Sequence, residues 1–153
     1  MPDICVRLAQ PSDGDELASL RTALWPQSSK DEHSREVALI LTGNAPVTMP
    51  LAILVAATSG GLAGFLEIDV RSHADGCNPS RPVGYVEGWF IAQEYRRQGL
   101  GARLMAAAED WARSQGCVEM ASDTWIDNEV SQRAHEALGF EVVDRCVHYR
   151  KAL

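Results

Sequence analysis

The chain has 153 residues, 46% of them hydrophobic and 23% charged, with 14 Lys and Arg against 21 Asp and Glu. The length fits one domain over residues 1–153, and the net charge of −7 excludes a generally basic nucleic-acid-binding protein, because no uniform positive field attracts phosphates. Residues 42–64 are uncharged but broken by Gly, Asn, Pro and Thr, so they do not form a membrane span, and the N-terminus lacks an export signal. We therefore expect a cytoplasmic protein that binds neither nucleic acid nor membrane.

In the first half of the chain, the spacing of apolar residues predicts a strand, two amphipathic helices and a β-hairpin. The first helix ends near Trp25, because Pro26 cannot continue it. The predicted ranges are 4–8 for the strand, 11–25 for the first helix with its capping turn, about 28–41 for the second helix, and 51–58 and 62–70 for the hairpin.

The second half predicts a strand, a Gly-bearing turn, an amphipathic helix, another strand, a capped helix and one or two closing strands. With the first half, this order predicts an α/β (α+β) layer structure whose mixed, mostly antiparallel central sheet is flanked by helices. The predicted ranges are 83–91, 96–101, 100 to about 115, 117–124, 127 or 128 to 139, and 140 to about 151.

The cysteines and histidines show no metal-ligand spacing, because no C-x-x-C pair occurs and the gaps are long and unequal. We therefore expect reduced thiols and no metal. The residues are Cys5, Cys77, Cys117, Cys146, His33, His73, His135 and His148.

The strongest functional pattern is the strand 86–91, which leads into the R-x-x-G-x-G turn at Arg96–Gly101 and then into a helix. The first N–H groups of a helix have no intrahelical acceptor and carry partial positive charge, so a pyrophosphate fits there. Gly99 and Gly101 lack Cβ, which lets the backbone close on phosphates. A Walker-type site is excluded because no G-K-S/T follows, and a simple tight turn is the alternative.

This turn resembles the acetyl-CoA signature of the GNAT N-acetyltransferase superfamily. Asn128 begins the following helix, where the superfamily often uses an Asn to bond the pantetheine arm, and residues 135–140 look like its Y-x-x-L-G-F ending. The resemblance implies a GNAT fold with acetyl-CoA as co-substrate at a splayed central strand. It assigns cofactor binding to Trp89, Phe90, Ile91, Arg97, Gln98, Gly99, Leu100, Gly101, Ala102 and Asn128.

A narrower resemblance extends over nearly the whole chain, to the small aminoglycoside 6′-N-acetyltransferases. It implies acetyl transfer to the 6′-amine of these drugs, antibiotic resistance and a homodimer. A GNAT enzyme that acts on a polyamine or a protein N-terminus remains an alternative, as does a non-catalytic acyl-CoA-binding module. The matching segments are 24–26, 86–90, 119–123, 131–135 and 137–141.

The acceptor site needs carboxylates, because an aminoglycoside is a polycation and its ammonium must lose a proton before it attacks a thioester. Glu87 lies on the central strand and Asp123 ends the neighbouring strand, so both are candidates for catalysis and substrate binding. The alternatives are a solvated strand acid for Glu87 and a helix or loop cap for Asp123.

The resemblance assigns five further residues. Trp25 faces the sugar ring in the related enzymes, with core packing as the alternative, and Ser28 and Asp144 align with substrate contacts. Asp144 is otherwise an exposed strand acid. Ala74 stands where related enzymes carry a Tyr that reaches the drug. His135 stands where the superfamily often has a Tyr as general acid, and a solvated helix-face His is the alternative.

Overall fold

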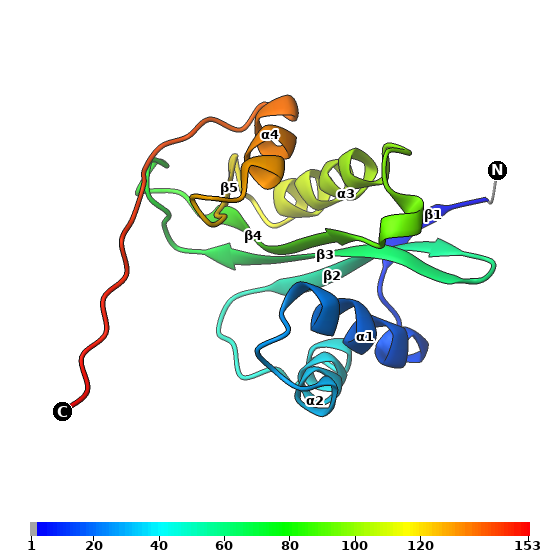
Figure 1. The fold of residues 1–153 in the computed structure, drawn as a ribbon. Helices are drawn as coiled ribbons and strands as arrows, with labels where there is room; N and C mark the ends of the chain where they lie inside the picture. The colour runs from blue at the N-terminus through cyan, green and yellow to red at the C-terminus, as the bar shows by residue number, and fades with distance from the viewer. Residues whose placement is uncertain (1–2) are drawn as a thin grey trace.

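A computed structural model describes residues 3–153 as a five-stranded sheet in the order β1-β2-β3-β4-β5, with helices on both faces (Figure 1). Three strand pairs are antiparallel and β4–β5 is parallel, which confirms the mixed, mostly antiparallel sheet. The strands are β1 (Cys5–Leu8), β2 (Leu51–Thr58), β3 (Gly61–Arg71), β4 (Val83–Ile91) and β5 (Glu119–Ser122). The helices are α1 (Gly14–Leu24), α2 (Lys30–Leu41), α3 (Leu100–Ser114) and α4 (Glu129–Ala137), with short 3₁₀ turns at Pro11–Asp13 and Gln93–Tyr95.

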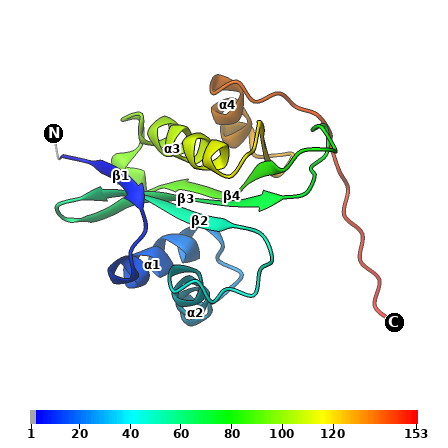
Figure 2. The same cartoon turned by 180° about the vertical axis from the view of Figure 1, so that it is seen from behind.

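Two apolar clusters form the core, one on each face of the sheet. Helices α1 and α2 cover one face and α3 and α4 cover the other (Figures 1 and 2). Because side chains alternate along a strand, β3 sends Phe65 toward α1 and α2, and Leu66 and Ile68 toward α3. This double burial explains why β3 is apolar on both of its faces over much of its length.

A β-bulge interrupts the pairing of β4 with β3. Glu67 of β3 pairs with Gly88, and the next residue, Ile68, pairs with Val86, so Glu87 is an extra residue in β4. On the other edge of β4, the pairing with β5 ends at Val86 and Ser122. From Glu87 onward, β4 therefore has a partner on one edge only, and the sheet splits there.

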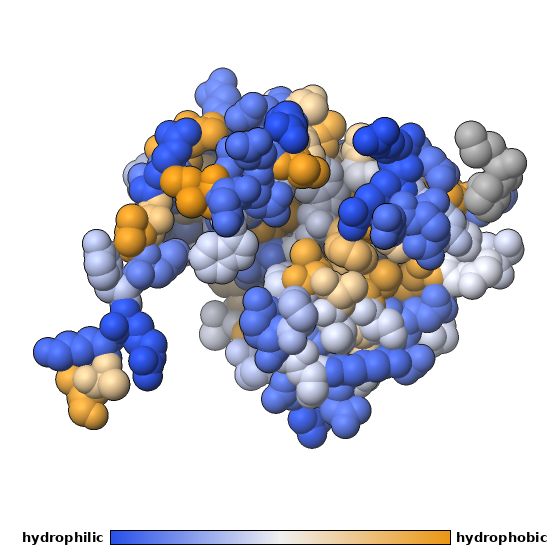
Figure 3. Space-filling view, viewed as in Figure 1, coloured by the Kyte–Doolittle hydropathy of each residue, from blue (hydrophilic) through white to orange (hydrophobic). Residues whose placement is uncertain are grey.

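The closing strands predicted for 140–151 are wrong. Residues 140–153 form no strand, and 141–153 are all exposed. Figures 1 and 3 show this segment leaving α4 and running away from the body of the molecule. The sequence has strand-like side chains, but a strand needs a neighbour to accept its backbone hydrogen bonds, and this segment pairs with no strand within residues 3–153.

Strand β5 is also shorter than the predicted range 117–124. Cys117 is buried at the end of α3, where its N–H donates to Ala112 O at 3.0 Å. Asp123 therefore follows the strand as the first residue of a loop. No helix within residues 3–153 is long and apolar enough to cross a membrane.

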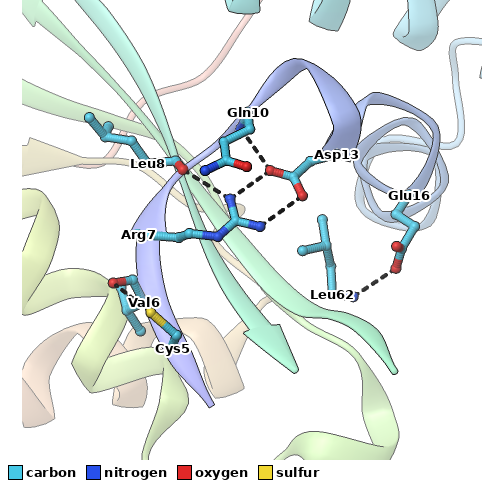
Figure 4. A network of polar contacts seen from close by, with 8 residues as sticks. All are labelled: Cys5, Val6, Arg7, Leu8, Gln10, Asp13, Glu16 and Leu62. Atoms are coloured by element: carbon cyan, nitrogen blue, oxygen red, sulfur yellow. Dashed lines mark hydrogen bonds and ion pairs between the residues drawn. The ribbon is translucent and has the colours of Figure 1, made fainter. Parts of the chain in front are cut away.

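A charged contact fixes the start of α1 against the sheet (Figure 4). Arg7 of β1 donates from Nη1 and Nη2 to the carboxylate of Asp13 at 2.7 and 3.0 Å, and Gln10 N–H donates to the same carboxylate at 2.7 Å. Glu16 then accepts from Leu62 N–H at 2.7 Å, which joins α1 to the β2–β3 hairpin. The Arg7 hydrogen bonds lower the pKa of Asp13, and burial offsets part of that effect.

Replacing Asp13 with Asn should lower the free energy of unfolding by about 1.5–3 kcal/mol near neutral pH, because charge-assisted hydrogen bonds are lost. The folded-state pKa of Asp13 lies below its ordinary value, so its contribution is complete above about pH 4 and disappears as the pH falls through the folded-state pKa. Urea denaturation across this pH range should show that the difference in free energy of unfolding between wild type and Asp13→Asn decreases as the pH falls.

Asp15→Asn is the control, because the Asp15 side chain on the same helix is 86% exposed and should lose little. A gap between wild type and Asp13→Asn that stays constant down to about pH 2 would show that the charge of Asp13 contributes nothing.

Candidate functional site

The turn that leads from β4 to α3 has an open helix N-terminus. Arg96 Nε donates to Ile91 O at 2.9 Å, and Arg97 and Gly99 have φ of 62° and 75°, in the left-handed region. The first backbone bond of α3 runs from Arg103 N–H to Gly99 O at 3.1 Å, and no side chain caps the helix. The N–H groups of residues 100–102 therefore have no intrahelical partner, which is the arrangement that binds an anion.

Trp89 connects β4 to the starts of the neighbouring helices. Its Nε1 donates to Gly101 O at 3.1 Å, and a Cβ on Gly101 would lie 3.1 Å from the indole. On its other side, the His135 ring of α4 meets Trp89 edge to face at 5.3 Å between centroids. Ile91 packs in the same α3-side cluster, whereas the Phe90 side chain points to the other face, beside Phe65.

The split between β4 and β5 opens beside Trp89. Residues 88–91 use one edge to pair with β3, and no strand pairs with their other edge, where Ile91 O accepts from Arg96 Nε. An extended ligand with amide groups can hydrogen-bond there in the manner of a strand. A free N–H in this position can also stabilise an oxyanion.

Asn128 and His135 both have partners within the protein. Asn128 Oδ1 accepts from Ser131 N–H at 3.1 Å and so caps α4. His135 Nδ1 lies 2.7 Å from Ser131 O, which only accepts, so Nδ1 carries the proton. His135 Nε2 lies 2.7 Å from Ser122 Oγ. With both ring nitrogens bonded, the geometry favours a structural role for His135 over that of a free proton donor.

On the opposite face, three carboxylates gather around the β4 bulge. Glu67 and Asp69 come from β3, and Glu87 is the bulged residue of β4. Burial raises the pKa of Glu67 to about 7, although Arg21 of α1 lies 3.5 Å away and opposes the shift. Burial and the neighbouring Glu87 raise the pKa of Asp69 to about 6. Sequence reasoning missed Glu67 and Asp69, whose signal was two acids at alternate positions in an otherwise apolar strand.

Arg71 and Tyr85 connect this group to Asp123. Arg71 donates to Glu87, and its Nε lies 3.7 Å from Asp69 Oδ1. Its guanidinium carbon lies 3.4 Å from the centre of the Tyr85 ring, and Tyr85 OH donates to Asp123 Oδ2 at 2.7 Å. Glu87 and Asp123, which the sequence placed on adjacent strands, are therefore linked through these two side chains. We call Asp69, Arg71, Tyr85, Glu87 and Asp123 the acidic cluster.

Trp25 forms one wall beside the bulge. A Cβ on Gly88 would lie 2.6 Å from the indole, so the ring packs on the bulge. Trp25 also packs edge to face with Phe65 at 6.0 Å and stacks on His33 at 6.3 Å, so it both joins the core and borders the site. Ser28 lies next to it, with its N–H 3.5 Å from Trp25 O.

The other two predicted substrate contacts do not join the acidic cluster through any hydrogen bond of residues 3–153. Ala74 is half-buried in the 72–82 loop, where its carbonyl accepts from Cys77 N–H at 3.1 Å. Asp144 lies in the exposed C-terminal segment and accepts from Arg145 N–H at 2.7 Å. Within residues 3–153, no group of three or more His, Cys, Asp or Glu side chains could hold a metal ion.

A hollow of about 480 Å³ lies beside the acidic cluster. Residues 46–49 line one side and residues 69–73 line the other, so Asp69 and Arg71 belong to its wall. The arrangement can therefore hold a cationic ligand larger than one amine.

Comparison with known proteins gives consistent matches. The sequence matches the acetyltransferase (GNAT) family over residues 15–140. It is 42% identical over 149 residues to an aminoglycoside N(6′)-acetyltransferase type 1 of Klebsiella aerogenes, covering 97% of this chain and 96% of that protein. It is 43% identical over 140 residues to the protein of the same name from Serratia marcescens, covering 91% and 92%.

A solved structure is also similar over its whole length. It is AAC(6′)-Iy in complex with the bisubstrate analogue CoA-S-monomethyl-acetylneamine, with a TM-score of 0.87 and 34% identity over 99% of each chain.

Gly88→Ala should destabilise the protein by about 1–3 kcal/mol, because the added methyl group has to displace Trp25 from the bulge. Gly14→Ala is the matched control: its Cβ meets nothing within 4 Å and its backbone is helical, so a gain of about 0.5–1 kcal/mol is expected. Urea denaturation measures both changes. Equal effects in the two variants would mean that the Trp25 contact does not constrain β4.

Proposed function

Because this chain belongs to the acetyltransferase (GNAT) family and is an acyltransferase, we propose that it transfers the acetyl group of acetyl-CoA to the 6′-amine of aminoglycosides and so confers resistance. The observation that carries this proposal is the bulge at Glu87, with an open strand edge on one side and an acidic cluster on the other. An acyl donor and a cationic acceptor can meet there.

In this proposal, acetyl-CoA is the co-substrate and occupies the β4–β5 split. Its pyrophosphate binds the backbone of residues 97–102, since the free N–H groups at the start of α3 lie there. Its pantetheine arm runs along Trp89–Ile91 and passes Asn128 at the start of α4. The first turn of α3 holds no acidic residue that would repel the pyrophosphate, which supports this assignment.

The acceptor amine binds Glu87 and Asp123 beside Trp25. An ammonium held by carboxylates is stabilised as the cation, so its deprotonation has to be coupled to acyl transfer. A group with a pKa near neutrality is suited to take up that proton. Asp69, with a pKa of about 6, lies next to Glu87 and can pass the proton to solvent.

A panel of three amines tests the proposal directly. Acetyl-CoA is incubated with kanamycin, spermidine or a peptide with a free N-terminus, and release of the free thiol is followed. We expect kanamycin to be acetylated fastest. Turnover with spermidine or the peptide alone would assign another amine, and acetyl-CoA binding without turnover would indicate a non-catalytic module.

Asp123→Asn and Glu87→Gln keep the side-chain shape and remove the charge, so they separate binding from proton transfer. If a carboxylate accepts the proton, its variant should lose about 10²–10⁴-fold in kcat. If it only holds the cation, KM for tobramycin should rise while kcat survives. Steady-state kinetics of both variants measures this, and values near wild type in both would remove these carboxylates from the site.

The proposal also concerns the setting of the enzyme. Residues 1–153 act as one acetyltransferase domain in the cytoplasm, where a cysteine-bearing protein stays reduced. The four cysteines are free, and two of them, Cys5 and Cys146, are exposed. A reducing compartment keeps such exposed thiols from forming disulfides.

The enzyme further works as a homodimer in which the C-terminal segment 141–153 of each copy docks on the sheet edge of the other. The segment is extended and exposes Val142, Val143, Val147 and Tyr149, and Figure 3 shows its end standing clear of the body. Within this chain, β5 is the last strand of the sheet, so its outer edge can accept a further strand. In a dimer with two-fold symmetry, the C-terminal segment of each copy pairs with the β5 edge of the other copy.

Deleting residues 141–153 should convert the dimer to a monomer, because the apolar segment that bridges the copies is lost. Deleting only Ala152 and Leu153 is the control and should leave the dimer intact. Light scattering after size-exclusion chromatography measures the mass of each. A monomeric full-length chain would exclude the homodimer, and a dimeric 141–153 deletion would show that the contact lies elsewhere.

A further inference from the structure

We infer that Arg71 is a specificity-determining residue: in the free protein its guanidinium occupies the place of a substrate ammonium group, and a cationic ligand displaces it. The inference deepens the proposed function and rests on it.

The groups around Arg71 are those that bind an organic cation. Its Nη2 donates to Glu87, its Nε faces Asp69 Oδ1 at 3.7 Å, and its guanidinium carbon lies 3.4 Å from the centre of the Tyr85 ring. Carboxylates and an aromatic face attract an alkylammonium group by the same forces. A substrate amine that reaches Glu87 therefore competes with Arg71 for the same oxygen.

Arg71 is free to leave, in contrast to Arg21, which lies on the same face. The Arg21 side chain is 6% exposed and lies between Glu36 at 2.6 Å and Glu67 at 3.5 Å. The Arg71 side chain is 42% exposed and lines the hollow beside residues 46–49. Its guanidinium can turn toward this solvent-filled space without being buried unpaired, so displacement costs little.

This exchange explains how the site selects its ligands. A neutral sugar brings no charge to Glu87 and leaves Arg71 in place, so it is excluded. A single amine replaces one ion pair with another and gains little. A polycation replaces Arg71 at Glu87 and places a second ammonium group near Asp123, so it gains net free energy.

Three variants test the exchange. Arg71→Gln removes the competing charge and keeps most of the side-chain length, and Arg71→Lys keeps the charge. Arg113→Gln is the matched control, since Arg113 is an exposed residue of α3 that pairs with Glu109 and Asp110. KM and kcat for kanamycin, KM for acetyl-CoA and a calorimetric Kd for kanamycin are measured near pH 8, where the carboxyls are ionised.

For Arg71→Gln, we expect KM and Kd for kanamycin to fall about three- to fivefold, with kcat and the acetyl-CoA KM changed less than about twofold. Arg113→Gln should stay close to wild type, and Arg71→Lys, which keeps the competing charge, should give a KM and Kd for kanamycin nearer to wild type than those of Arg71→Gln. A purely structural role for Arg71 predicts instead a lower kcat and a weaker Kd.

A KM or Kd that rises or stays unchanged in Arg71→Gln would overturn the inference, as would equal behaviour of the Gln and Lys variants. These outcomes are distinct from failure of the proposed function, in which wild type itself does not acetylate kanamycin. If wild type binds kanamycin without turnover, the comparison of Kd values still decides the role of Arg71. If neither wild type nor Arg71→Gln binds kanamycin, the inference is overturned.

Discussion

The extra residue at Glu87 in β4 is the constraint on which both halves of the site depend. Without it, the pairing of β3 and β4 would stay in one register, and every side chain after Glu87 would point to the opposite face. The bulge brings Glu87 beside Asp69 and Arg71 while Trp89 turns toward α3 and α4. It also coincides with the end of β5 pairing, so the unpaired edge of β4 and the acidic cluster adjoin the same few residues.

The bulge is held in place by packing from both layers. Trp25 lies on Gly88 from the α1 side, and Trp89 donates to Gly101 at the start of α3. Both contacts need a glycine, because a Cβ at either position would approach the indole at 2.6 or 3.1 Å. The two tryptophans thus pack against the strand from opposite faces, at the point where one of its edges has no neighbouring strand.

The polar groups of this face are arranged for charge exchange more than for stability. Buried Glu67 and half-buried Asp69 have raised pKa values, so in the free protein their ionisation is only partly compensated. A folded protein tolerates such strain where it serves ligand binding. In the proposed function, the polycationic substrate supplies the missing positive charge, which a neutral sugar cannot do.

The sequence determined the order of the elements, because the 2.0 and 3.6 residue periods of strands and helices are local properties of the chain. It also determined the Gly-bearing turn at Arg96–Gly101 and limited the cap of the last helix to Asp127 or Asn128, because both features depend largely on neighbouring residues. Glu87, Asp123 and Trp25 could be named from their motifs, but not the contacts that they make.

Only the tertiary structure decided the acidic cluster and the fate of the C-terminal segment. Glu67, Asp69 and Arg71 meet Glu87 because β3 lies beside β4 with one residue of slip, and a slip leaves no mark on either strand's own pattern. Residues 140–151 have the side chains typical of a strand but do not pair with another strand. Strand formation depends on a partner's backbone, and the residues of a segment do not specify where that partner is.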